Sequence, residues 1–315
     1  MYKDKLVSVV IPAHNEEKLI SKAIHACPDF VDKIIIINDL SSDKTREIVE
    51  AETKRNSKLV LINHEVNQGV GGAIATGYKW SRDNNMDVAV VMAGDAQMDP
   101  NDMPALLDAI IDDGVDYAKG NRLFVGDVRE KMPAFRYYGN QLLSLMTKMA
   151  SGYWHIFDSQ SGYVAINKKA LKRINWDKMY KRYGQPNDLL VRLNIENMRV
   201  RDIPINPIYG IGEKSGIKVR KLVFTLSILL CKRFLWRLKE KYIVRNFHPL
   251  VLFYGLGGLF GIVTAILSVR LAYFWIFHDQ LPRINALAAF FAFTSCSLFS
   301  LFAMWFDMDQ NKDLK

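Results

Sequence analysis

The stretch VVMAGDAQMDP, residues 90–100, runs four apolar residues directly into Gly94-Asp95-Ala96-Gln97 and then stops at Asp99-Pro100. Two explanations fit this pattern. The first is a buried strand that ends in an ordinary surface turn. The second is a carboxylate held at the edge of a sheet, where it can meet a metal ion or a phosphate group. The segments on either side decide between these explanations.

Short β-branched runs alternate with helical segments through residues 1–212. LVSVVIPA, KIIIIND, KLVLINH and DVAVVMAGD are typical of strands, and SSDKTREIVEAETKR, GGAIATGYKWSRDN and NDMPALLDAIIDD of helices. This alternation predicts an α/β fold with a parallel, doubly wound sheet, in which ligands bind beyond the carboxyl ends of the strands. The first candidate site residues are therefore those that directly follow strands: His14, Asn15, Glu16, Asn38, Asp39, Asp95 and Gln97.

Asp95 and Gln97 place two oxygen donors two residues apart near that edge. Hard divalent ions such as Mg²⁺ and Mn²⁺ take ligands of this kind and complete their shell with substrate phosphates and water. Other metal chemistry is disfavoured, because the six histidines show no HExxH spacing. The three cysteines lie far apart, which argues against a zinc site or a disulfide framework and fits a reducing compartment.

Further polar motifs each leave two interpretations open. NQGVGGAIATG, residues 67–77, is glycine-dense ahead of a helix, which fits either a close approach to phosphate or tight packing. Arg122 and Arg136 are candidate phosphate clamps, because a guanidinium matches phosphate geometry, but surface salt bridges explain them equally well. FDSQSGY contains Asp158 beside small polar residues. Asp188 precedes an apolar helical run, where helix capping is the alternative to function.

The second part of the chain has the composition of a membrane protein. Residues 249–269 and 284–306 contain no charged residue, and at ~1.5 Å per residue each can cross a hydrocarbon core of ~30 Å. Residues 214–245 hold ten Lys or Arg against one acid, a net +9 that equals the charge of the whole chain. A basic segment fits nucleic acid or an anionic membrane surface, and the apolar runs that follow select the membrane. We therefore expect no nucleic-acid partner.

These observations predict three parts: an α/β domain at 1–212, basic amphipathic helices at 213–246, and a transmembrane hairpin at 247–315. The basic helices are expected to lie in the membrane interface, with a soluble basic helix as the alternative. The positive-inside rule then places the α/β domain and both termini in the cytosol, as in a multi-pass protein of the inner (cytoplasmic) membrane. The first residues lack a long apolar core, so no signal peptide is predicted.

The ordered set VVIPAHNEE, INDLSSDKT, NQGVGGA, GDAQMDP, DSQSGY and NDLL, across roughly residues 5–220, resembles the family-2 glycosyltransferases. It is most similar to the polyprenyl-phosphate branch, the relatives of dolichyl-phosphate mannose synthase. The resemblance implies a GT-A fold, a Rossmann-like doubly wound sheet. It implies that the donor is bound by Pro12, His14, Glu16, Asp39 and Gly69. It further implies that Asp95 and Gln97 hold Mg²⁺ or Mn²⁺, that Arg122 and Arg136 bind the acceptor phosphate, and that Asp95, Asp158 and Asp188 are catalytic.

The implied reaction is the inverting transfer of a sugar from a UDP- or GDP-linked donor to a polyprenyl (undecaprenyl or dolichyl) phosphate, as a step of glycan biosynthesis. Two motifs depart from the family pattern: the usual D-x-D is Ala93-Gly94-Asp95, and the usual D-D is Asn38-Asp39. The absence of a Q-x-x-R-W run argues against a processive polysaccharide synthase. Two alternatives stay open, namely another lipid acceptor and a non-catalytic sugar-nucleotide sensor or scaffold. The sequence also leaves open the nucleotide, the sugar and homo-oligomerisation.

Overall fold

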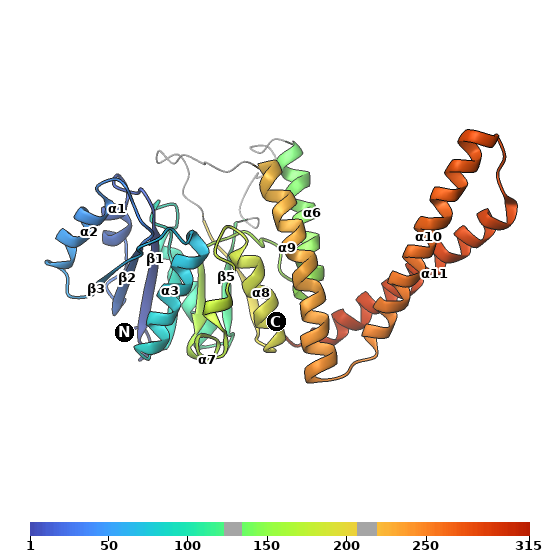
Figure 1. Ribbon diagram of the computed structural model, residues 1–315. Helices are drawn as coiled ribbons and strands as arrows, with labels where there is room; N and C mark the ends of the chain where they lie inside the picture. The colour runs from blue at the N-terminus through green and yellow to red at the C-terminus, as the bar shows by residue number, and fades with distance from the viewer. Residues whose placement is uncertain (123–133, 207–218) are drawn as a thin grey trace. The chain divides into compact units, whose positions relative to one another are not determined.

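The computed structural model describes the backbone of residues 1–122, 134–206 and 219–315 (Figure 1). Side chains are described over residues 1–122, 141–206 and 223–315. The chain divides into two compact units: the first is Met1–Phe234 with Asp313–Lys315, and the second is Leu235–Lys312.

The first unit alternates strands with helices, as the sequence predicts. Its strands are β1 (Val7–Ala13), β2 (Lys33–Asn38), β3 (Leu59–Asn63), β4 (Val88–Val91), β5 (Tyr117–Asn121), β6 (Val164–Asn167) and β7 (Val200–Pro204). Its α-helices are α1 (Ile20–His25), α2 (Thr45–Thr53), α3 (Val70–Asp83), α4 (Met103–Ile111), α6 (Ala134–Ser151), α7 (Lys168–Arg173) and α8 (Gln185–Ile195), with short 3₁₀ turns η1 (Pro100–Asp102) and η3 (Trp176–Lys178).

The seven strands form one sheet in the order β3-β2-β1-β4-β6-β5-β7. β1 pairs in parallel with both β2 and β4, and β2 pairs in parallel with β3. The expectation of a parallel sheet is wrong for β6, which runs antiparallel to β4 and to β5. β6 is only four residues long, and its apolar pattern marks it as buried without indicating a direction.

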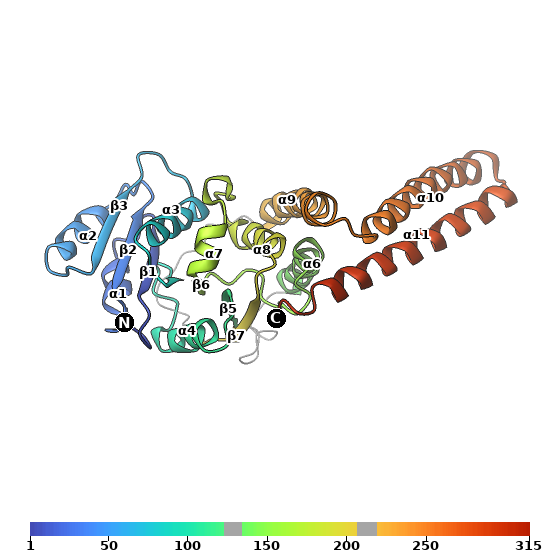
Figure 2. The ribbon, with the colours of Figure 1, turned by 90° about the horizontal axis from the view of Figure 1, so that it is seen from below.

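Hydrophobic residues cover both faces of the sheet, which explains the continuous apolar runs of the strands. Val7, Val9 and Ile11 of β1 face the core beneath α1, α2 and α4, whereas Val10 faces the core beneath α3, α7 and α8 (Figure 2). α3 approaches β1 most closely at Gly77, where an added Cβ would lie 2.2 Å from Val10 Cγ1. A glycine is therefore required at this contact.

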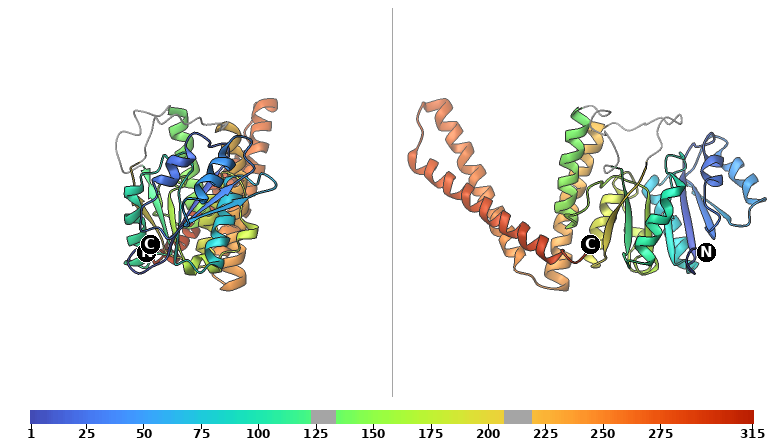
Figure 3. Two further views of the ribbon diagram at one scale, coloured as in Figure 1. Left: turned by 90° about the vertical axis from the view of Figure 1, so that its left-hand side faces the viewer. Right: turned by 180° about the vertical axis from the view of Figure 1, so that it is seen from behind.

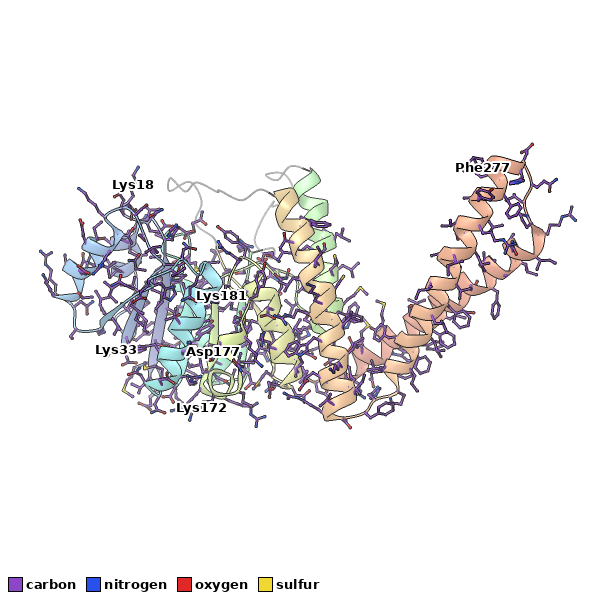
Figure 4. All side chains as sticks on the ribbon, in the orientation of Figure 1. Lys18, Lys33, Lys172, Asp177, Lys181 and Phe277 are labelled. Atoms are coloured by element: carbon purple, nitrogen blue, oxygen red, sulfur yellow. The ribbon has the colours of Figure 1, made fainter. Side chains whose placement is uncertain are left out.

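The residues after the strands share one edge of the sheet. Figure 4 places Lys18, which follows β1, and Lys33, which begins β2, at opposite edges. The register pairs Ala13 at the end of β1 with Asn38 at the end of β2. The segments after β1, β2, β3 and β4 therefore converge at the carboxyl edge.

The second unit contains α10 (Leu250–His278) and α11 (Arg283–Gln310), which lie side by side (Figure 3). Aromatic contacts join them: the rings of Phe253 and Phe306 are 5.3 Å apart and those of Phe260 and Phe299 are stacked at 5.8 Å. Both helices are long and apolar enough to cross a membrane, by length and composition. Most of their large apolar side chains are exposed, including Phe277 near the far end of the pair (Figure 4).

The predicted basic segment is helical where it is described. α9 (Val219–Lys239) continues into η4 (Glu240–Arg245), a π-helical turn, and residues 213–218 lie outside the described residues. Within the second unit, Arg237 donates to both carboxylate oxygens of Asp307 on α11, each at 2.8 Å. Tyr242 donates to the same carboxylate at 2.8 Å. This buried ion pair fixes the start of the second unit to the end of α11.

The last three residues return to the first unit. Val200 N donates to Leu314 O at 3.1 Å, and Arg199 Nε donates to Lys315 O at 3.0 Å. Leu314 packs against the hydrophobic core beneath α3 and α8. The chain that follows α11 is therefore attached to β7, the last strand of the sheet.

Candidate active site

Asp39 organises the segments that follow β2 and β3. Its side chain is 3% exposed. His64 Nδ1 lies 2.8 Å from Asp39 Oδ1, and the Gln68 and Gly69 amides donate to the carboxylate at 2.8 and 2.7 Å. A buried carboxylate with several such partners is held rigidly. Asp39 therefore fixes the entry into α3.

The glycine-dense segment is packed against the chain that precedes α8. A Cβ on Gly69 would lie 2.6 Å from Lys181 O, and one on Gly71 would lie 2.4 Å from Tyr180 O. Gly69 also has φ +78°, a conformation that favours glycine. These contacts support the tight-packing interpretation. The predicted role of Gly69 in donor binding remains a prediction, and the Gly69 amide is already bonded to Asp39.

Three left-handed residues other than glycine stand at the carboxyl edge. Asn15 follows β1 with φ 59°, Leu40 follows β2 with φ 58°, and Ala96 follows β4 with φ 55°. Each such conformation costs roughly 1–2 kcal/mol, and strain of this kind concentrates at functional sites. The loops after β1 and β2 offset this cost by hydrogen bonding to each other, since Asn15 N donates to Ser41 Oγ and Ser42 N donates to Asn15 Oδ1.

Asp95 and Gln97 lie on either side of the strained Ala96. Gln97 N donates to Asp95 Oδ1 at 3.1 Å, which closes a tight turn after β4. Glu16 packs beside this turn, because a Cβ on Gly94 would lie 3.5 Å from Glu16 Cγ and 3.2 Å from Pro12 O. Burial, followed by the negative charges of Asp95 and Asp43, raises the pKa of Glu16. The carboxyl edge thus gathers acidic side chains that repel one another.

This donor set fits a divalent cation of the Mg²⁺ or Mn²⁺ kind. Its ligands are hard oxygens, and a cation would relieve the repulsion between Asp95 and Glu16. Within the described ranges, His, Cys, Asp and Glu form no group of three or more suited to a metal. The predicted assignment of a cation to Asp95 and Gln97 therefore remains a prediction.

His14 lies at the same edge. Its Nδ1 atom is 2.9 Å from the carbonyl oxygen of Asp39, which also accepts a hydrogen bond from the Asn67 side chain at 3.1 Å. The His14 side chain is exposed. Pro12 is the penultimate residue of β1 and pairs with Ile37 of β2. The structure thus brings together the predicted residues of β1, β2 and β4.

Arg122 and Asp158 form the second group of candidate residues. Arg122 Nε and Nη2 donate to the two carboxylate oxygens of Asp158 at 2.8 and 3.1 Å. Asp158 is buried, whereas the Arg122 side chain is 39% exposed. Burial alone would raise the pKa of Asp158, but the Arg122 hydrogen bonds and the charge of Lys119 lower it to about 2. Asp158 is therefore ionised at neutral pH and orients Arg122.

Asp188 is enclosed within the protein. It is 0% exposed, and its carboxylate accepts from Tyr180 N at 2.8 Å and Arg192 Nε at 3.0 Å. Arg233 Nε of α9 lies 2.5 Å from its other oxygen. These contacts tie α8 to α9. They give Asp188 a docking role, and its predicted catalytic role remains a prediction. Arg136 is the third residue of α6, and its side chain lies outside the described residues, so its predicted role remains a prediction.

Two kinds of residue at the site are absent from the sequence predictions. His64 follows β3 as the other candidates follow their strands, so its position gives the same signal. Lys119 on β5 and Asp202 on β7 lie within strands, and nothing in their sequence context distinguishes them.

The chain is similar to known glycosyltransferases in both sequence and fold. The model of the family described as Glycosyl transferase family 2 matches residues 8–174, and the chain belongs to this family. A relative from Methanococcus voltae, named UDP-N-acetylglucosamine--dolichyl-phosphate N-acetylglucosaminyltransferase, is 35% identical over 65% of this chain and 87% of its own length. The polyprenol monophosphomannose synthase of Mycolicibacterium smegmatis is 26% identical over 70% of this chain and 84% of its own length.

Among solved structures, glucosyl-3-phosphoglycerate synthase from Mycobacterium tuberculosis is similar in fold. Its complex with Mn²⁺, UDP and glucosyl-3-phosphoglycerate superposes with a TM-score of 0.55 at 17% identity, covering 74% of this chain and 80% of that one. This likeness supports the GT-A fold that the sequence predicts.

Proposed function

We propose that this protein transfers a sugar from a nucleotide sugar to a polyprenyl phosphate at a membrane surface. The observation that carries the proposal is the presence, in one family-2 chain, of a strained acidic edge, an arginine oriented by a buried carboxylate, and two helices of membrane-spanning length. The relatives named for dolichyl-phosphate and polyprenol chemistry support it.

The donor binds at the carboxyl edge after β1–β4. His14 and Glu16 border the nucleotide, while Asp39 holds the surrounding segments in place. Asp95 and Gln97 would hold Mg²⁺ or Mn²⁺, and the bound ion would supply positive charge against the diphosphate leaving group. UDP-N-acetylglucosamine is the first donor to test, because the Methanococcus voltae relative is named for it; GDP-mannose is the second.

The acceptor phosphate binds beside Arg122, with Arg136 as its predicted partner. A phosphate monoester has a second pKa near ~6 and is largely dianionic at neutral pH. One of its oxygens attacks the anomeric carbon, the bond from that carbon to the diphosphate breaks, and the configuration inverts. The acceptor carries no proton that must be removed, so Asp158 does not serve as a base. Its charge keeps the Arg122 guanidinium in place.

The chain crosses the membrane as a hairpin, with its catalytic unit in the cytosol and both ends of the hairpin on that side. The attachment of Leu314 and Lys315 to the first unit supports an even number of crossings. α9 lies in the interface: Phe224 is 70% exposed, and the segment is rich in Lys and Arg, which favour an anionic inner-membrane surface.

The test uses purified protein in detergent with undecaprenyl phosphate and Mg²⁺ or Mn²⁺. A panel of UDP- and GDP-sugars is offered, and lipid-linked sugar is detected by mass spectrometry. Transfer of one sugar by the wild type, lost in Asp95→Ala, is the expected result. Donor binding without transfer across the panel supports the sensor alternative. Preference for diacylglycerol over a short-chain polyprenyl phosphate in competition supports the other acceptor class.

A further inference from the structure

Two charged side chains, the buried Lys119 and the half-buried Asp202, lie beneath the Arg122–Asp158 pair and have no part in the function proposed above. Lys119 on β5 is 0% exposed, and the sheet register pairs it directly with Asp202 on β7. Partners in register on neighbouring strands project from the same face. The two side chains therefore form a charged layer under the loop that carries Asp158.

Asp202 connects the two segments that carry the pair. Its Oδ2 atom accepts from Asn121 Nδ2 at 2.8 Å and from Phe157 N at 2.7 Å. Asn121 directly precedes Arg122, and Phe157 directly precedes Asp158. One carboxylate oxygen thus fixes the residue before each member of the ion pair.

Lys119 holds the other end of the Asp158 loop. Its Nζ atom donates to Ser161 O at 3.0 Å. Burial lowers the pKa of Lys119 to about 8, and the charges of Asp158 and Asp202 oppose that shift. Burial also raises the pKa of Asp202. Charges withdrawn from water in this way are a poor source of stability, because apolar residues fill the same space at less cost.

We infer that Lys119 and Asp202 are positioning residues that set the geometry of the Arg122–Asp158 pair and thereby the binding of the acceptor phosphate. This inference rests on the proposed function for the identity of the acceptor. The layer acts through the loop at residues 157–161 and touches neither donor nor acceptor. Its loss should therefore change acceptor binding and leave donor binding intact.

The test compares Asp202→Asn with Asp116→Asn. Asp116 is the control, since it is at least as buried as Asp202 and likewise accepts from an asparagine side chain (Asn167 Nδ2, 2.8 Å) and a backbone amide (Arg199 N, 2.8 Å). Asp116 directly precedes β5, whereas Arg122 directly follows β5, so the control lies at the opposite end of that strand. A purely structural effect should be similar in both variants.

We expect Asp202→Asn to raise the acceptor KM about tenfold or more, since small misplacements of a binding group cost up to about 100-fold. The donor KM and the Tm loss should match those of Asp116→Asn. Equal acceptor KM values in the two variants would overturn the inference. So would a rise in the donor KM of Asp202→Asn as large as the rise in its acceptor KM. If Asp202→Asn fails to fold, Asn121→Ala removes one of the two tethers and should raise the acceptor KM by a smaller factor; an unchanged acceptor KM there overturns it equally.

Binding of citronellyl phosphate, measured by calorimetry, separates this inference from the proposed function. A wild type that binds no phosphate monoester contradicts the proposed acceptor. If the wild type and Asp202→Asn bind citronellyl phosphate equally tightly, the positioning role is contradicted and the proposed acceptor is not.

Discussion

The two halves of the sheet hold their candidate residues by different means. After β1–β4, the half proposed to bind the donor (the donor half) relies on backbone amides and imidazole: Asp39 accepts from the Gln68 and Gly69 amides, and the strained turns interlock. Around β5–β7, the half proposed to bind the acceptor (the acceptor half) relies on charge, through Arg122–Asp158 and Asp188–Arg192. Parallel strands bring their ends together without further aid. The mixed half, where β6 reverses, needs long side chains to bridge its segments.

The largest effect predicted from this contrast is on stability. Asp188→Ala leaves the buried Arg192 and the partly exposed Arg233 without their counter-charge, and breaking a buried pair costs about 3–5 kcal/mol. The free energy of unfolding, measured by denaturant titration in detergent, should fall by that amount. Asp177→Ala is the control, because its ion pair with Lys79 is exposed and worth about 0–1 kcal/mol. An equal loss in the two variants would remove the contrast.

The second prediction concerns Asp95, the candidate metal ligand of the donor half. Asp95→Ala should lower kcat about 10²- to 10³-fold, the usual cost of removing a group that stabilises developing charge. Sugar transfer to lipid phosphate is the measurement. Asp99→Ala changes an acid of the same loop whose carboxylate accepts from Asn101 N, and this variant should retain activity. Transfer that survives Asp95→Ala would remove the metal site from this edge.

The third prediction sharpens the contrast from the donor side. Asp39→Asn keeps the shape of the side chain. It replaces one hydrogen-bond-accepting oxygen with an NH₂ group, which then faces the N–H group that donated to that oxygen. We expect the free energy of unfolding to fall by about 1–3 kcal/mol and the donor KM to rise, with the acceptor KM unchanged. Steady-state kinetics with each substrate varied in turn measures both. A rise confined to the acceptor KM would show that the two halves are not separate.

The smallest effect is a pH dependence of the acceptor half. Burial lowers the pKa of Lys119 from 10.5 to about 8 in the folded chain. Between pH 8 and pH 10.5, Lys119 is therefore protonated to a greater extent in the unfolded chain than in the folded chain. The contribution of Lys119 to stability therefore rises with pH through that window. Acceptor binding should change in the opposite direction, weakening about two- to threefold as the charge is lost above pH 8. Lys119→Arg should shift this loss of acceptor binding to higher pH. If the loss stays at the same pH, it is caused by the titration of another group.

The sequence predicts the grouping of the residues after β1–β4 better than the contacts around β5–β7, while the roles of both groups remain predictions. His14, Glu16, Asp39 and Asp95 meet because each follows a strand, and parallel strands end at one edge. The same rule points to His64. The prediction was incomplete where partners come from distant segments: Asp188 meets Arg233, and Lys119 meets Asp202. Local periodicity records burial and secondary structure, but it does not record pairing between distant residues or the reversed direction of β6.

The return of Leu314 and Lys315 to β7 has a consequence for the order in which the first unit is completed. That unit comprises residues on both sides of the two apolar helices, Met1–Phe234 and Asp313–Lys315. Val200 N donates to Leu314 O, an acceptor that is synthesised only after α10 and α11. The last hydrogen bond of the first unit at β7 therefore forms only after both of these helices have been made, although β1–β7 precede them in the chain.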